Sequence, residues 1–151
     1  MELTVKIKKL SDKIGNEIPL PYYATGGSAA MDLHACIDAP LEILPGGSVS
    51  VPTGLAIGLP SEGYVALIFA RSGLAIKHGI TLPNCVGVID SDYTGEIKVG
   101  LINLSGKPYA VNSGDRIAQL AVMPVLRAKF ELTDELDITK RGAGGFGSTG
   151  K

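Results

Sequence analysis

The sequence lacks tryptophan, contains only two cysteines, and has no long apolar run and no excess of either charge. Its 14 basic and 15 acidic residues give a formal net charge of -1. Such a chain has no overall field that would attract nucleic acid or an anionic membrane, so any phosphate binding must come from a local site. No apolar stretch reaches the roughly 18 residues of a membrane span, and residues 1–8 alternate apolar and polar side chains. We therefore expect a soluble cytoplasmic protein that contacts neither nucleic acid nor membranes.

The scarcity of cysteine also argues against disulfides and zinc. Cys36 and Cys85 stand far apart in a chain without an export signal, and such thiols are more often reduced than paired. His34 and Cys36 lack the further ligands of a zinc site. We predict two free thiols and no zinc.

Glycine and proline, by contrast, are frequent, with 20 and nine residues, and leave few windows for an average helix. Short apolar segments recur between turn sequences. Val49 to Leu59 alternates as half-buried strands do, and Tyr64 to Ala70 is apolar on both strand faces, as in a strand inside a core. Ile97 to Leu104 and Ile117 to Val125 follow the same pattern less completely. The spacing predicts one all-β domain, a sandwich or barrel, over residues 1–138.

One short helix is expected, from Ser72 to His78. Ser72 is a residue type that caps helix N-termini, and Gly79 is the type that ends them.

Residues 139–151 differ from the rest in composition. Arg141 to Gly150 contains five glycines and one large apolar residue, Phe146. Such a segment cannot bury enough surface to offset its ordering entropy, so alone it should be a flexible arm. The simple interpretation is a disordered tail without function. Such a tail does not explain the presence of Arg141, Phe146, Ser148 and Thr149 among the glycines.

Two familiar motifs are false matches. Gly142-x-Gly144-x-x-Gly147 fits the dinucleotide-binding pattern, but no strand and helix can flank it so close to the end of the sequence. Asp90-x-Asp92-x-Thr94-Gly95 begins like a calcium loop, yet Leu101 stands where a bidentate Glu is needed.

A polar cluster remains inside strong strand patterns. Asp90 follows the apolar Val86 to Ile89 and is placed to accept a proton from water, while Tyr93 offers a flat face for a sugar or base. Asp92 to Gly95 suits a type I turn, which gives Asp92 a structural role that Asp90 lacks.

A second group of residues suggests phosphate binding. Arg71 and Ser72 stand at the expected start of the helix, where an anion is favoured, although an N-cap Ser beside a surface Arg explains them equally well. Asp32 is open to two interpretations, as a turn residue or as part of a Mg²⁺ site.

In their order and spacing these segments match the five motifs of the trimeric dUTPase family, which the chain resembles from about Val5 to its end. The five are residues 29–35, Arg71 to Leu74, Gly87 to Gly95, Gly114 to Gln119, and Arg141 to Gly150. The third and the fifth are the most specific.

The resemblance implies a β jelly roll that forms a homotrimer with three active sites at subunit interfaces, each closed by a neighbour's C-terminal arm. It implies Mg²⁺-dependent hydrolysis of dUTP to dUMP and pyrophosphate, which keeps uracil out of DNA and supplies dUMP for thymidylate synthesis. Asp90 then activates the water that attacks the α-phosphorus, and Tyr93 stacks on deoxyribose and excludes a 2′-hydroxyl. The resemblance also implies that uracil is recognised by Asn84 and by the hairpin around Lys98, from Ile97 to Val99, and that Phe146 stacks on the base. Phosphates would be bound by Arg71, Ser72, Gly73 and Gln119, and the γ-phosphate by Arg141, Ser148 and Thr149. Asp32 would bind Mg²⁺ through water.

Two positions limit the resemblance. Arg116 is left outside the predicted site, as a residue that holds the fold, and Ala70 stands where the family usually has Pro, which loosens the start of the helix.

Two other functions remain open: a dCTP deaminase of the same fold, and a catalytically silent nucleotide-binding module. Asp90 together with the arm favours the diphosphatase over both.

Overall fold

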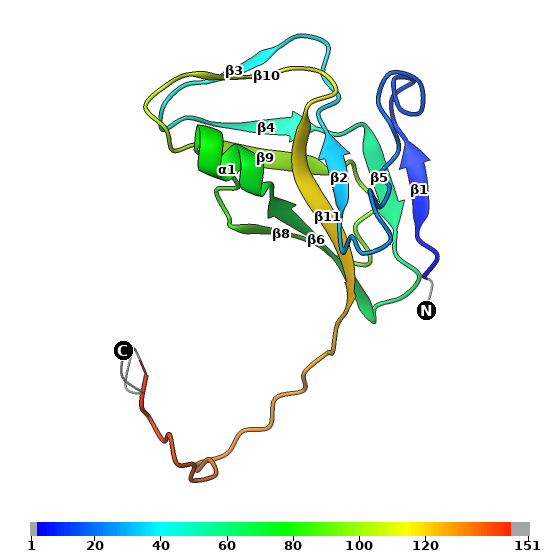
Figure 1. The fold of residues 1–151 in the computed structure, drawn as a ribbon. Coiled ribbons are helices and arrows are strands. Elements are labelled where there is room, and N and C mark those ends of the chain that lie inside the picture. The colour runs from blue at the N-terminus through cyan, green and yellow to red at the C-terminus, as the bar shows by residue number, and fades with distance from the viewer. Residues whose placement is uncertain (1–2, 146–151) are drawn as a thin grey trace.

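Antiparallel strands make up most of the folded body. The structure is a computed structural model that describes residues 3–145 (Figure 1). In chain order its elements are β1 (Lys6–Lys9), β2 (Met31–His34), β3 (Leu41–Ile43), β4 (Ser48–Pro52), β5 (Leu55–Gly58), β6 (Tyr64–Ala70), α1 (Ser72–His78), β7 (Ile80–Thr81), β8 (Val86–Ile89), β9 (Lys98–Asn103), β10 (Tyr109–Val111) and β11 (Arg116–Pro124).

The strands form four sheets around one core. The largest has the order β2-β11-β6-β8, a second has the order β4-β9-β7, and β1-β5 and β10-β3 form two pairs. Neighbours in these sheets often lie far apart in sequence, as β2 and β11 do. The predicted all-β jelly roll with one short helix is confirmed. The core is apolar and includes Leu33, Ile43, Val51, Ile68, Ile80, Val99, Leu101, Val111 and Ile117.

Strand β6 is predicted over its correct residues, but only one of its faces is fully buried. Ala66 and Ile68 point into the core, whereas Val65, Leu67 and Phe69 are only half-buried. Since cross-strand partners share a face, Val88 and Met123 lie beside Leu67 and Val65 on the outer side of the sheet. The expectation of a strand buried on both faces is therefore wrong for one chain alone, because nothing in the described part of this chain covers the outer face.

The start of the helix also differs from the prediction. Arg71, with φ -84° and ψ 127°, is the N-cap residue, no side chain caps the helix, and Ser72 is the first helical residue. The cause is β6, whose pairing with β11 continues through Ala70 and leaves Arg71 as the one extended residue before the helix. Because Ala70 is fixed in this ladder, the strand holds the start of the helix where the family usually has Pro. The predicted end is confirmed, since Gly79 has φ 68° and its N–H bonds Ala75 O.

The chain leaves the folded body after β11 (Figure 1, orange). Beyond Pro124 the described residues form neither helix nor strand. Among residues 3–145 there is no helix long and apolar enough to span a membrane. Cys36 and Cys85 are both free thiols, as predicted.

Candidate functional site

A group of charged side chains, here named the Asp32 cluster, lies where β2, β11 and the end of β6 meet. Asp32 Oδ1 accepts a hydrogen bond from Arg71 Nε at 3.0 Å and one from Gln119 Nε2 at 3.5 Å. Its Oδ2 accepts one from Arg116 Nη1 at 3.2 Å. Arg71 Nη1 also donates to Arg116 O at 3.2 Å, so the two arginines are held side by side. The register explains the meeting, because Asp32 and Gln119 are direct partners across the β2-β11 ladder.

The Asp32 cluster carries a net positive charge, since two guanidinium groups surround one carboxylate. The side chains of Asp32 and Arg71 are about four-fifths buried, with 20% and 22% exposed, while Arg116 remains 57% exposed. Burial lowers the pKa of the neighbouring His34; Asp32 opposes this shift, and Arg116 and Arg71 add to it. His34 therefore stays neutral and adds no charge near pH 7. The cluster is suited to an anion with several oxygen acceptors.

The first turn of α1 extends this surface. Ser72 and Gly73 follow Arg71 directly, and both are exposed. A Cβ built at Gly73 would meet no atom within 4 Å. Packing within the described part of this chain therefore does not require glycine at position 73. The absence of a side chain leaves the backbone there open to approach by another molecule.

The second group, here named the Asp90 pocket, lies at the end of β8. A hollow of about 200 Å³ is lined by Val88, Ile89, Asp90, Tyr93, Glu96 and Lys98. Within the described residues, the exposed Asp90 carboxylate has no hydrogen bond and no ion pair. Tyr93, 45% exposed, donates from its hydroxyl to Glu96 O at 2.8 Å. The pocket thus combines a free carboxylate with an aromatic face.

The turn in this segment lies two residues earlier than predicted. The hydrogen bond that closes it joins Tyr93 N to Asp90 O at 3.1 Å, so the turn runs from Asp90 and not from Asp92. Asp suits the first position of a type I turn at either residue. The Tyr93 hydroxyl engages Glu96 and so favours the earlier turn. Asp90 therefore has a structural role in its backbone, contrary to the expectation, while its carboxylate stays free.

The two groups lie at opposite ends of β6. Ile89, which precedes Asp90, pairs with Ala66, whereas Arg71 follows Ala70. Arg71 is five residues beyond Ala66, which corresponds to about 16 Å of extended chain. Asn84 is outside the Asp90 pocket and precedes β8, whose first residue Val86 pairs with Phe69 near the Arg71 end. One chain thus brings Asp32, Arg71 and Gln119 together, and brings Asp90, Tyr93 and Lys98 together, but keeps the two groups apart.

Only the beginning of the predicted arm site is described. Arg141 is exposed, and its Nε donates to Gly144 O at 2.8 Å. Thr139 Oγ1 accepts from Gly142 N at 3.1 Å. Phe146, Ser148 and Thr149 lie outside the described residues.

A Mg²⁺ ion can be tested against the donors of the Asp32 cluster. Among the described residues, no three His, Cys, Asp or Glu side chains gather as a metal cage. Both Asp32 oxygens accept hydrogen bonds from neighbouring side chains. Mg²⁺ usually keeps several waters and binds one or two carboxylates together with substrate phosphates. The donor set fits an ion that takes most of its ligands from substrate phosphates and water, and it does not form a cage by itself.

The sequence interpretation missed two residues near these groups. Arg116 was left outside the predicted site, but the structure places it in the Asp32 cluster. The sequence patterns assign no role to Glu96, yet it lines the Asp90 pocket together with Tyr93 and Lys98. Asp115-Arg116 within a matched motif was the available signal for Arg116, whereas Glu96 gave none beyond its place next to Gly95.

The chain is similar to known proteins along nearly its whole length. The family model described as dUTPase matches residues 16–150. A Coxiella burnetii protein named deoxyuridine 5′-triphosphate nucleotidohydrolase is 52% identical over 151 residues, which cover 100% of this chain and 99% of that protein. A Hahella chejuensis protein of the same name is 49% identical over 150 residues, 99% of each chain.

Solved structures agree on the fold. The dUTPase of Staphylococcus bacteriophage 80alpha with dUPNHPP has a TM-score of 0.86 at 24% identity, covering 98% of this chain and 99% of the phage chain. A mutant dUTPase from phage phi11 of S. aureus, described with a structural Mg(II) ion, has a TM-score of 0.76 at 22% identity, covering 89% and 99%. The full-length identity to nucleotidohydrolases and the family match over nearly all of its residues show that the chain belongs to the dUTPase family.

Proposed function

We propose that the chain hydrolyses dUTP to dUMP and pyrophosphate with Mg²⁺. The observation that carries this proposal is the pair of groups just described, a free carboxylate beside an aromatic face and a cationic cluster suited to phosphates. The full-length relatives named deoxyuridine 5′-triphosphate nucleotidohydrolase support the same activity and favour it over deamination of dCTP.

The chemical step is assigned to the Asp90 pocket. The Asp90 carboxylate accepts a proton from a water molecule whose oxygen forms a bond to the α-phosphorus. The bond between that phosphorus and the oxygen bridging to the β-phosphorus breaks, and pyrophosphate leaves with the bonding electron pair. Because no described side chain of this chain occupies the carboxylate, it is free to hold that water.

Phosphate binding is assigned to the Asp32 cluster and the start of α1. The guanidinium of Arg71, the amide of Gln119 and the exposed Ser72 and Gly73 offer donors to the phosphate oxygens, and positioning and charge neutralisation dominate phosphoryl transfer. Asp32 would hold Mg²⁺ through water. When bound there, the ion would neutralise negative charge on the phosphates and on the leaving group.

Substrate selection is assigned to residues along the hairpin. Tyr93 presents its ring to deoxyribose and leaves no room for a 2′-hydroxyl. Asn84 and the backbone around Lys98 would read uracil. A slot that hydrogen-bonds the pyrimidine edge rejects analogues lacking the matching groups more strongly than an apolar one does.

We also propose a homotrimer whose sites are shared between copies. The two groups lie about 16 Å apart along β6, whereas a water on Asp90 must reach the phosphorus directly. The outer face of the sheet, with Val65, Leu67 and Phe69, runs between them and is covered by nothing in the described part of this chain. A second copy packed on this face would bring its Arg71 near the first copy's Asp90.

The C-terminal segment supports the same assembly. Leu126, Phe130, Leu132, Leu136 and Ile138 are 86–101% exposed, which is costly in water for a row of large apolar side chains. We propose that the segment after β11, up to residue 138, packs against a neighbouring copy. This segment would then belong to the folded domain and not to the arm. Residues 139–151 then form the arm that closes a site with Arg141, Phe146, Ser148 and Thr149. The reaction is placed in the cytoplasm, where free thiols such as Cys36 and Cys85 persist.

One assay tests the activity. The protein is incubated with dUTP and with dCTP in the presence of Mg²⁺, and pyrophosphate and ammonia are measured. Pyrophosphate from dUTP is the expected result. Ammonia from dCTP would replace the proposal with a deaminase, and neither product would indicate a silent binding module.

A mixing experiment tests the shared site. At dUTP concentrations far below the raised KM of Arg71→Ala, this variant and Asp90→Asn are each expected to have little activity. Refolded together, they should regain activity, because some sites would combine an intact Asp90 from one copy with an intact Arg71 from another. A mixture as inactive as its parents at every ratio would place both groups in one chain's site.

A further inference from the structure

The side chain of Glu96 connects the Asp90 pocket to the core. Its Oε1 accepts a hydrogen bond from Gly54 N at 3.0 Å, and its Oε2 lies 3.8 Å from Lys98 Nζ. The carboxylate is only 25% exposed, against 57% for the Lys98 side chain. One half-buried carboxylate thus contacts the core-facing turn with one oxygen and a pocket residue with the other.

The attachment point at Gly54 is rigid. Gly54 has φ 66°, and a Cβ there would lie 2.8 Å from Cys36 Sγ and 3.2 Å from an Ile14 carbon. Its carbonyl accepts from Leu10 N at 2.8 Å, and the buried Thr53 beside it donates from Oγ1 to Ile97 O at 2.7 Å. The backbone on both sides of this contact is therefore fixed by the core.

The Tyr93 side chain contacts the backbone of Gly95 and Glu96. The Tyr93 hydroxyl donates to Glu96 O at 2.8 Å. A Cβ built on Gly95 would lie 2.7 Å from Tyr93 Oη and 2.8 Å from Cζ. The ring thus lies directly against Gly95, in space that any side chain there would take.

We propose that Gly95 and Glu96 are positioning residues that fix the Tyr93 ring, and through it the preference for deoxyribose over ribose nucleotides. Glu96 acts through its hydrogen bond to Gly54, which holds the carbonyl that receives the Tyr93 hydroxyl. Gly95 acts by leaving the space in which the ring lies. The inference rests on the proposed role of Tyr93 at the sugar.

The test compares kcat/KM for dUTP and UTP in matched variants. Glu96→Ala should lower the dUTP/UTP ratio about tenfold, the scale of losing a hydrogen bond to a charged group. Glu96→Gln keeps an oxygen that can accept from Gly54 N and should stay within about twofold of the parent ratio. Gly95→Ala should lower the ratio without removing any polar group.

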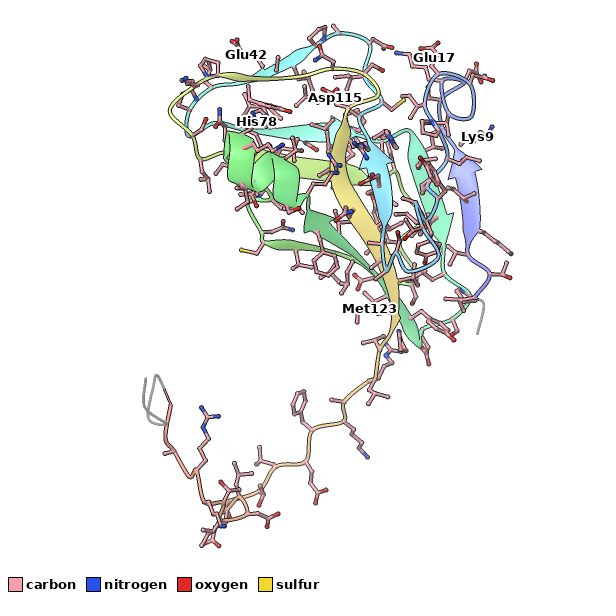
Figure 2. All side chains as sticks on the ribbon, in the orientation of Figure 1. Lys9, Glu17, Glu42, His78, Asp115 and Met123 are labelled. Atoms are coloured by element: carbon pink, nitrogen blue, oxygen red, sulfur yellow. The ribbon has the colours of Figure 1, made fainter. Side chains whose placement is uncertain are left out.

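Glu42→Ala and Glu42→Gln on β3 (Figure 2) are the controls, because Glu42 is exposed and remote from the pocket. Both control variants should leave the dUTP/UTP ratio of kcat/KM unchanged.

A double-mutant cycle separates positioning from a general loss of stability. Tyr93→Phe keeps the ring but removes its hydrogen bond to Glu96 O. In that background Glu96→Ala should change the ratio by less than about twofold, because residues that act through one contact are not additive. An equal change in both backgrounds would overturn the inference, as would an unchanged ratio in folded Glu96→Ala and Gly95→Ala.

NMR of ¹³C-tyrosine-labelled protein provides a readout apart from catalysis. The Tyr93 ring signals, identified by their loss in Tyr93→Phe, should shift in Glu96→Ala and Gly95→Ala but not in the Glu42 variants. Unmoved signals overturn the inference even where the ratio falls. If the signals shift and the ratio holds, the inference also fails, and Tyr93→Ala then decides whether the proposed sugar role of Tyr93 fails with it.

Discussion

The Asp32 cluster and the Asp90 pocket are built in opposite ways. In the cluster both oxygens of a largely buried carboxylate are held by three neighbouring side chains, and the two arginines are linked to each other. In the pocket the carboxylate is exposed and unpaired within the described residues, and only the Tyr93 ring beside it is fixed. The side chains of the cluster are thus fixed by one another, while the Asp90 carboxylate is not held by any described side chain.

The contrast fits the different tasks that we propose for the two groups. Fixed donors gain most where charge must be neutralised, because they need no reorganisation during the reaction. A general base must instead keep its oxygens free to accept a proton. Variants in the pocket should therefore affect turnover, and variants in the cluster should affect binding.

The largest effect is expected for Asp90→Asn. The amide cannot accept the proton, so kcat should fall by roughly two to four decades while the fold and nucleotide binding remain. Steady-state kinetics and dUMP titration measure the two quantities. Normal turnover of dUTP by this variant would remove Asp90 from the chemical step.

Removal of the arm should have the next largest effect. A chain ending at Lys140 loses no core residue, so it should fold and assemble, but activity should fall on the order of a hundredfold because donors to the terminal phosphate are lost.

Mixing shows whose site the arm closes. Refolding the truncated chain with full-length Asp90→Asn should restore activity if the arm crosses to a neighbour, because some sites would then have both an intact Asp90 and an intact arm. No recovery at any ratio would indicate an arm that serves its own chain.

Arg71→Ala tests the cluster. The variant loses a charged donor to phosphate and one hydrogen bond to Asp32, so KM for dUTP should rise by about 10- to 100-fold with a smaller change in kcat. Lys77→Ala, at an exposed lysine of the same helix, is the control. A fall in kcat alone would mean that the cluster acts mainly in the transition state.

Tyr93→Ala should relax discrimination against UTP, since the ring is the proposed barrier to a 2′-hydroxyl. We expect the dUTP/UTP ratio of kcat/KM to fall at least about tenfold, as for the loss of one well-placed contact. If the ratio is unchanged, another residue excludes ribose.

The smallest effect concerns stability and pH. Burial keeps the pKa of His34 below its usual value of about 6.5, so the folded chain binds this proton less readily than the unfolded chain does. The stability contributed by neutral His34 is complete above about pH 6.5 and is lost as the pH falls toward the folded pKa, by at most about 1.4 kcal/mol per pH unit. Urea unfolding at pH 7.5 and 5.5 without Mg²⁺ should show a smaller loss in His34→Gln than in the parent. Equal losses would mean that His34 does not contribute.

Local patterns predicted the strands and the helix well. The apolar run Tyr64 to Ala70 coincides with β6, and Ser72 to His78 coincides with α1, because alternation and helix breakers act over a few residues. The half-exposed outer face of β6 was not predictable from the same run, since its residues are equally apolar on both sides. That difference depends on what packs against each face, which periodicity does not encode.

The sequence offered candidate site residues of suitable chemical type, but it did not show their geometry. The motifs picked out Asp32, Arg71 and Asp90 by chemical type. They did not show that Asp32 would hold Arg116, or that Glu96 would reach Gly54, because both contacts join segments far apart in the sequence. The turn was misplaced from Asp90 to Asp92 for a related reason, since two aspartates two positions apart suit it equally.

Strand β6 sets the spacing between the two groups, and this has a consequence for insertions and deletions. One added codon within β6 would move Arg71 by about 3.3 Å relative to Ile89 and turn every later side chain of the strand to the opposite face. Leu67 would then occupy a core position such as that of Ile68, and the proposed shared site would lose its geometry together with the core. The length of this strand should therefore be nearly fixed in functional variants.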